Sequence, residues 1–315
     1  MSIAVIPLWE WIWMGFGCVS ALLHCAVLAT IYRARKFSNE TFFKVPFFMI
    51  VLIQGFHEIL EYLTVNFLNR TRKYMIIEYA VVEDNNIIEA EWYWYSFIKS
   101  VLYMGHMIIA ANRLSAFMFR NVGTYDRVWN TKSILLIVFG TYAISGFFRV
   151  VVFSPNVKTT TIFYNSTQTF SFTLSNNVMT FDSTVDTIIS VIAAFSCIVF
   201  YIITTILASR FRIETSKTRK QEMMLLKCGV ATFFILLPTP IRSGVEVWAA
   251  WTNHADIKEF VIKINMIPAE LMCVFQPWLL ILSCSTLRIR LFGRLCRRRI
   301  VKPSVLSSSS LTHAR

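Results

Sequence analysis

Charged side chains are scarce in this sequence: they make up 16 % of its 315 residues, whereas hydrophobic side chains make up 56 %. Soluble domains average about 25 % charged and about 45–50 % apolar residues. Glycine (10 residues) and histidine (5) are also rare, and the sequence holds no glycine-rich phosphate loop and no closely spaced Cys/His set. The composition argues against a soluble enzyme, and we predict no catalytic residue, no metal site and no cofactor.

Long apolar runs are what the sequence has instead. Each is at least about 20 residues long, enough at 1.5 Å per residue to cross a hydrocarbon core about 30 Å thick. We predict seven such spans: Leu8–Ile31, Val45–Phe67, Trp92–Phe119, Ser133–Phe153, Thr184–Ala208, Met224–Trp251 and Phe260–Ser283. The expected fold is an all-α integral membrane protein, a bundle of seven transmembrane helices. No basic residue precedes the first span, so we expect a retained helix and not a signal peptide.

Positive charge lies almost entirely on one side of these spans. Of the 31 Lys and Arg residues, 22 fall in segments on one side and 6 on the other. Basic loops face the cytoplasm, which predicts an outer N-terminus and an inner C-terminus. This topology accounts for the net charge of +13. In a soluble protein such a charge would suggest nucleic-acid binding, which we do not expect here.

The chain is expected to form one membrane domain, residues 1–286, with a short tail. Basic and apolar residues mix in 287–302, which predicts an amphipathic helix on the anionic inner leaflet. Cys296 in that helix is a candidate for S-palmitoylation, with an unmodified thiol as the equal alternative. The serine-rich residues 303–315 are expected to be disordered.

The predicted outer loops lack cysteine, so no disulfide can order them. Glycosylation sequons begin at Asn165 and Asn69 in these loops. Asn165 is the better placed, because Asn69 lies close to the bilayer. A third sequon, at Asn39, falls on the predicted inner side and should stay unmodified.

The third span carries a polar stripe. Lys99, Tyr103, His106 and Arg113 fall within an arc of about 80° on a helix. Charged residues in a span face the bundle interior, which would place Arg113 at the cytoplasmic mouth. For Lys99, snorkelling to the outer interface is an alternative of equal weight.

The end of this span, HMIIAANRLSAFMF at 106–119, resembles the corresponding helix end of nematode serpentine chemoreceptors. Phe42–Phe43, Trp129 and Gln276–Leu280 are also similar. The likeness covers nearly the whole chain and is strongest to the Srg superfamily, which includes the gamma and V classes. It implies a G-protein-coupled chemosensory receptor of the plasma membrane, located in the cilia of chemosensory neurons. It also implies that Arg113 lies where such receptors contact the G protein.

Asn112 precedes Arg113 and can accept a hydrogen bond from it but cannot form a charged pair. An acidic partner for Arg113 would therefore come from elsewhere, such as Glu214 or Glu222. Basic residues of the third inner loop flank this region. The predicted G-protein-coupling set is Asn112, Arg113, Arg210, Arg212, Lys217, Arg219 and Lys220.

Polar residues also mark the outer halves of other spans. Gln54, His57, Glu58 and Glu61 follow at helical spacing in the second span. Arg242 and Glu246 in the sixth are four residues apart and could pair. The predicted ligand-binding candidates are His57, Glu58, Glu61, Lys99, Tyr103, His106, Arg149, Arg242, Glu246 and Glu270. For any one of them, structural ion pairing is the simpler interpretation.

Prolines interrupt the last two spans. We expect Pro238 and Pro240 to kink the sixth span, and Pro268 and Pro277 to kink the seventh. A sixth helix that pivots at its kink would open an inner cavity below Arg113. Alternatively, the prolines are simply tolerated, as in many membrane helices.

Together these features predict a chemosensory receptor that binds a small molecule among the outer halves of helices 2–7. Its partners would be a heterotrimeric G protein and membrane lipids. A transporter or channel is the main alternative, although seven spans do not split into equal repeats. A structural membrane protein without signalling is the third possibility.

Overall fold

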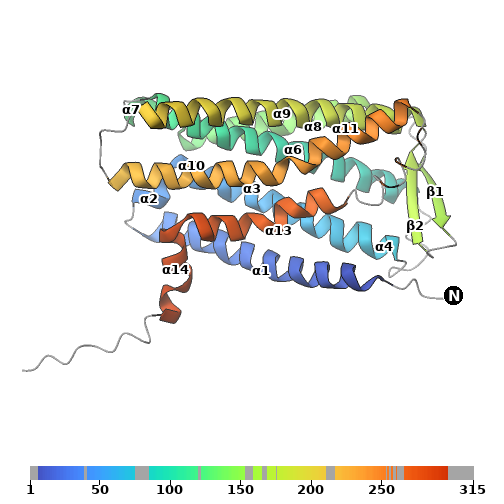
Figure 1. Cartoon of the computed structure of the whole chain (residues 1–315), viewed down its shortest axis with the longest axis horizontal. Coiled ribbons are helices and arrows are strands. Elements are labelled where there is room, and N and C mark those ends of the chain that lie inside the picture. Colours follow the sequence, from blue (N-terminus) through green and yellow to red (C-terminus); the bar gives the residue numbers. More distant parts are fainter. Residues whose placement is uncertain are drawn as a thin grey trace, which may run out of the picture.

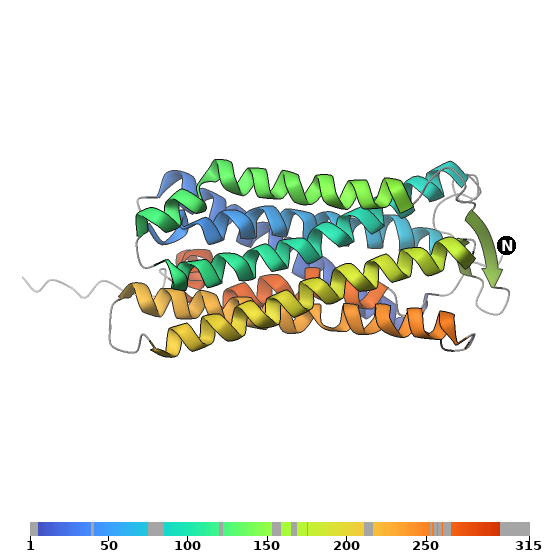
Figure 2. The same cartoon turned by 90° about the horizontal axis from the view of Figure 1, so that it is seen from above.

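The structure is a computed structural model that describes residues 6–38, 41–74, 85–119, 122–152, 159–164, 169–174, 176–210, 217–252, 254, 257, 260 and 266–296. In these residues, long helices run side by side in one bundle (Figure 1), and the view turned by 90° shows the same arrangement (Figure 2). They are α1 (Leu8–Phe37), α3 (Pro46–Leu63) continued by the π-helix η1 (Thr64–Arg70), α6 (Asn85–Met118), α8 (Thr131–Val152), α9 (Asn176–Arg210), α10 (Lys217–Leu236) with α11 (Pro238–Trp251), and α13 (Met266–Ser283). Each predicted span corresponds to one of these helices or pairs.

The two ends of the bundle carry different short elements (Figure 1). One end, called the α14 end below, holds α2 (Thr41–Lys44), α7 (Val122–Val128) and α14 (Ser285–Cys296). The opposite end, called the hairpin end, holds the N-terminus, α4 (Thr71–Lys73) and the strands β1 (Thr159–Tyr164) and β2 (Thr169–Leu174). The strands pair antiparallel, from Thr159 opposite Leu174 to Tyr164 opposite Thr169. The sequence analysis did not predict this hairpin.

Burial in the bundle is reversed relative to a soluble protein. Leu136, Phe195 and Phe234 are 74 %, 66 % and 63 % exposed, whereas Glu58 and Arg113 are fully buried. Exposed apolar surface of this extent needs a partner, and lipid chains supply it along a bundle of this length.

The length and composition of the helices also indicate a membrane protein. In the described chain, four helical segments are long and apolar enough to cross a membrane: Leu8–Phe37, Pro46–Arg70, Phe181–Arg210 and Met223–Ala249. A fifth follows if Glu270–Ser283 and Ser285–Gly293, bent by 97°, count as one span. Among the rest, Thr131–Phe147 is a shorter apolar helix, and α6 carries the buried charges Lys99 and Arg113. The chain is a helical multi-pass membrane protein.

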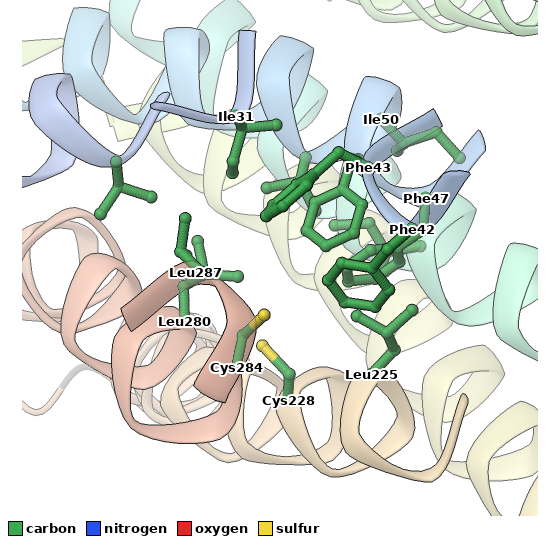
Figure 3. Packing of buried hydrophobic residues seen from close by; sticks show 14 of the residues in the cluster. Ile31, Phe42, Phe43, Phe47, Ile50, Leu225, Cys228, Leu280, Cys284 and Leu287 are labelled. Carbon is green, nitrogen blue, oxygen red and sulfur yellow. The ribbon is translucent and has the colours of Figure 1, made fainter. Parts of the chain in front are cut away.

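Apolar packing is densest toward the α14 end. There the buried side chains of several elements meet, as Figure 3 shows. Ile31 of α1, Phe43 of α2 and Phe47 of α3 pack with Leu225 of α10 and Leu287 of α14. This cluster includes the Phe42–Phe43 pair of the chemoreceptor resemblance. It fixes α14 at the base of the bundle.

One of the expected proline kinks is visible. The sixth span breaks at Leu237, and Pro238 begins α11, with Pro240 in the same first turn. Pro277 lies inside α13, and Pro268 is the third described residue of that helix, directly after residues that lie outside the described chain. The kinks expected at Pro268 and Pro277 stay predictions. A sharp bend of 97° lies between α13 and α14.

Candidate functional site

Arg113 lies fully buried near the end of α6. Its guanidinium donates a hydrogen bond of 2.6 Å to the Asn112 side-chain oxygen and one of 3.4 Å to the Tyr125 hydroxyl of α7. Asn112 also donates to Tyr125, at 3.0 Å. The Phe47 ring centroid of α3 lies 4.4 Å from the guanidinium carbon, a cation–π geometry. These contacts join α6 to α3 and α7. We call the group formed by Asn112, Arg113, Tyr125 and Phe47 the arginine latch.

Two further residues of the chemoreceptor-like sequence, Ser115 and Trp129, support the arginine latch. Ser115, three residues after Asn112, accepts a hydrogen bond of 2.6 Å from the indole N–H of Trp129. Trp129 is buried and directly follows α7. This second bond holds α7 against α6, so that Tyr125 reaches the latch.

The rest of the predicted coupling set is only partly visible. Arg210 is exposed at the end of α9. Arg212 lies outside the described residues, and Lys217, Arg219 and Lys220 lie in α10 with side chains that are not described. The acidic partners suggested for Arg113 fall in the same group: Glu214 lies outside the described residues, and the side chain of Glu222 is not described. Tyr125, which was not predicted from the sequence, is one partner of Arg113 in the described chain, beside the predicted Asn112.

Lys99 does not snorkel to the interface. It is 5 % exposed and forms an ion pair with Asp186 of α9. Its ammonium also lies 5.4 Å from the Tyr95 ring centroid. The prediction that Lys99 faces the interior is confirmed. Asp186 was missed, although a lone aspartate in an apolar span is itself a signal of an interior partner.

Other predicted ligand candidates gather near this ion pair. Arg242 and Glu246 of α11 pair at 2.9 Å along the helix, as their spacing predicted. Tyr103 is fully buried between the helices, and its hydroxyl has no hydrogen-bond partner in the described chain. Tyr103 interacts electrostatically with Asp186, Arg242 and Glu61. Tyr103 thus lies within the electrostatic range of charged side chains of α3, α9 and α11, and we call these four residues the Tyr103 site.

The polar residues predicted in the second span contact different neighbouring helices. His57 bonds the Ile53 carbonyl at 2.7 Å and the Tyr142 hydroxyl of α8. Gln54 donates to the Leu102 carbonyl of α6 at 3.2 Å. Positions three residues apart differ by about 60° around a helix, so each reaches a different partner. His57 therefore faces α8 and lines a small cavity between α3, α6 and α8.

The two glutamates of this stripe are fully buried without a Lys or Arg partner in the described chain. Glu58 lies between His24 of α1, at 3.6 Å, and His106 of α6, at 3.9 Å. Glu61 faces the Cys273 thiol at 3.8 Å. His24 was missed, although it is a polar residue within the first predicted span.

Glu270 belongs to a different group, at the hairpin end. Arg70 of η1 donates to both of its carboxylate oxygens, at 2.9 Å for the longer bond. Trp13 and Asn66 donate to it at 2.6 Å and 3.0 Å. Arg70 also pairs with Glu10 of α1 at 3.3 Å, and Lys73 pairs with Glu10 at 3.0 Å. This Arg70 cluster ties α1, η1 and α13 together, and its contacts favour structural pairing over ligand binding for Glu270.

The remaining predicted sites lie at the edge of the described chain. The side chain of Arg149 in α8 is not described, and neither is that of Cys296, the last residue of α14. Asn69 lies in η1, and Asn165 lies outside the described residues, directly after β1. All six cysteines with described side chains are free, and no metal-binding group of His, Cys, Asp and Glu occurs in the described residues.

An apolar exterior around an ion-paired interior is the arrangement of a helical membrane protein. A family model described as serpentine type 7TM GPCR chemoreceptor Srv matches residues 13–296. The chain therefore belongs to this family of chemoreceptors, which is not a family of enzymes. The predicted resemblance to serpentine chemoreceptors is thereby confirmed, and the assignment to the Srg superfamily stays a prediction. A comparison with curated proteins finds no match.

Proposed function

We propose that this protein is a chemosensory receptor of the Srg superfamily in the plasma membrane, placed in the cilia of chemosensory neurons, with its hairpin end outside. A small molecule would bind at the Tyr103 site. A heterotrimeric G protein would bind at the α14 end, at Arg113 and the basic residues that follow α9. The family match supports this assignment in general terms, because it describes a G-protein-coupled chemoreceptor.

The observation that carries the proposal is the placement of Tyr103 and Arg113 on one helix. Ten residues separate them, which is about 15 Å along α6. A ligand that shifts α6 at Tyr103 therefore acts directly on the arginine latch. Because Arg113 is fully buried, a G protein can reach it only after the latch opens.

The break at Leu237 supports the same mechanism. α10 and α11 are separate helices, and each contacts α9 and α13. A rotation of α10 about this break would move the α14 end of the sixth span while α11 stays near the Tyr103 site. Ligand binding would favour the open arrangement by as much as its affinity for the two states differs.

The test is to express the chain with reporter G proteins and to screen small volatile and soluble compounds. We expect ligand-dependent signalling that Arg113→Ala abolishes. Arg33→Ala is the matched control, because Arg33 is an exposed arginine of α1. At the other end, Asp186→Asn should weaken the response to a ligand by breaking the Lys99 pair. Substrate-driven currents or uptake without G-protein activation would contradict the proposal and support a transporter or channel.

A further inference from the structure

Three helices bring His24, Glu58 and His106 together in the middle of the bundle. His24 Nε2 lies 3.6 Å from one carboxylate oxygen of Glu58, and His106 Nε2 lies 3.9 Å from the other. Both distances exceed that of a hydrogen bond. Both ring nitrogens of His24, both oxygens of Glu58 and Nε2 of His106 are buried without a hydrogen-bond partner in the described chain. Buried polar groups left in this state need an explanation.

The charge of the cluster supplies that explanation. With Glu58 ionised and both imidazoles neutral, one negative charge would be fully buried without a cationic partner in the described chain, which is costly in an apolar interior. The amide of Gln54, one turn earlier on α3, interacts with the carboxyl group but brings no charge. One added proton makes the cluster neutral, whichever atom carries it. The proton would also turn one of the long contacts into a hydrogen bond between an imidazole and the carboxyl group.

The surrounding titratable groups supply no compensating positive charge. Glu61 lies one turn further along α3 and is itself an acid. Cys273 of α13 donates its thiol to the Glu58 carbonyl at 2.8 Å, and Cys228 of α10 interacts electrostatically with Glu58. The nearest lysine on α6, Lys99, is paired with Asp186 and acts on Glu61.

We propose that His24, Glu58 and His106 form a proton-binding site that holds one proton while α1, α3 and α6 are packed. In a chain open to water, a glutamate is ionised above about pH 4.3 and a histidine is neutral above about pH 6.5. Above about pH 7, the packed protein therefore holds one proton more than the unfolded chain. Its stability must then fall as the pH rises. Any conformation that admits water to the cluster releases the same proton, so acid favours the packed conformation.

The experiment uses the full-length protein in lipid nanodiscs and follows thermal unfolding between pH 7 and pH 8.5. For one linked proton, the equilibrium constant of unfolding should rise by up to about tenfold per pH unit. Glu58→Gln should remove most of this slope. His254→Gln should keep it, because His254 is an exposed histidine stacked near Trp248 outside the cluster.

A wild-type stability that does not change over this pH range would overturn the proposal, as would equal slopes in wild type and Glu58→Gln. If Glu58→Gln does not fold, His24→Gln and His106→Gln should each reduce the pH dependence of stability. If both variants keep the wild-type pH dependence, the proposal is contradicted. The wild type alone can also exclude the site. Calorimetric unfolding in two buffers of different ionisation enthalpy should report the release of at least one proton at pH 7.5, and a value of zero would contradict the proposal.

Discussion

Two groups of buried acids in this protein have opposite surroundings. Glu270, in the Arg70 cluster, accepts hydrogen bonds from Arg70, Asn66 and Trp13. Glu58 and Glu61, about two to three turns away from Arg70 along α3 and η1, have no Lys or Arg partner in the described residues. The comparison distinguishes two roles of a buried acid within the membrane. An acid paired with a cation holds helices together, whereas an acid without a cation binds a proton or a ligand.

The largest effect should come from breaking the paired group. Arg70→Met leaves Glu270 buried without its cation, which typically costs about 3–5 kcal/mol. We expect a large fall in the unfolding temperature and in the yield of folded protein, measured by thermal unfolding in detergent. Arg33→Met, at an exposed arginine of α1, should change little. A near-normal stability of Arg70→Met would show that the ion pairs do not hold α1, η1 and α13 together.

A smaller effect should follow from disturbing the helix contact beside the unpaired acids. Gly105 of α6 packs directly on the Gln54 side chain of α3, and an added Cβ would overlap its amide oxygen. The amide must move aside and lose its hydrogen bond to the Leu102 carbonyl, which costs about 1 kcal/mol. Gly105→Ala should therefore lower the unfolding temperature, whereas Gly140→Ala, where nothing lies near the added carbon, should not. Equal behaviour of the two variants would contradict the close approach of α3 and α6.

The arginine latch extends the comparison to the α14 end. Tyr125→Phe removes a hydroxyl that bonds both Asn112 and Arg113. A hydrogen bond to a charged group contributes about 1.5–3 kcal/mol, and one between neutral groups about 1 kcal/mol. We expect basal G-protein signalling to rise by about tenfold, measured by nucleotide exchange on the reporter G protein. Unchanged basal signalling would mean that the Tyr125 hydroxyl does not restrain Arg113.

The smallest effect is expected at the unpaired acid itself. Glu58→Gln removes a carboxyl group that has no cation to lose, so stability at pH 7 should stay within about 1 kcal/mol of wild type. The unfolding temperatures of Glu58→Gln and Arg70→Met should be measured under the same conditions, because the expected difference between them tests the comparison. A loss as large as that of Arg70→Met would indicate that Glu58 has a cationic partner after all.

Much of the bundle could be predicted from the sequence, because span length and hydropathy depend on local composition. The all-helical membrane fold, the Arg242–Glu246 pair and the break at Pro238 agree with the predictions, and the interior one of the two alternatives for Lys99 is confirmed. The residues that were not predicted are those whose roles depend on contacts between helices. Asp186, Tyr125 and His24 are single polar residues whose partners lie on other helices, and no spacing along the chain identifies such partners.

Two local features also escaped prediction. The π-helix η1 follows directly on α3 and brings Asn66 and Arg70 into the interior, where both reach Glu270. Its sequence has no proline or glycine to mark the change of helix type. The hairpin of β1 and β2 lies in a Thr- and Phe-rich loop for which the sequence predicts only a glycosylation sequon.

Both proposed sites depend on one claim, that the hairpin end of the bundle faces the outside. The glycosylation state of the protein from a eukaryotic host tests this claim most directly. Asn165 should carry a glycan that Asn165→Gln removes, and Asn39→Gln should leave the mass of the glycosylated protein unchanged apart from the substitution. A glycan on Asn39, with none on Asn165, would invert the topology and contradict both the ligand and the G-protein assignments.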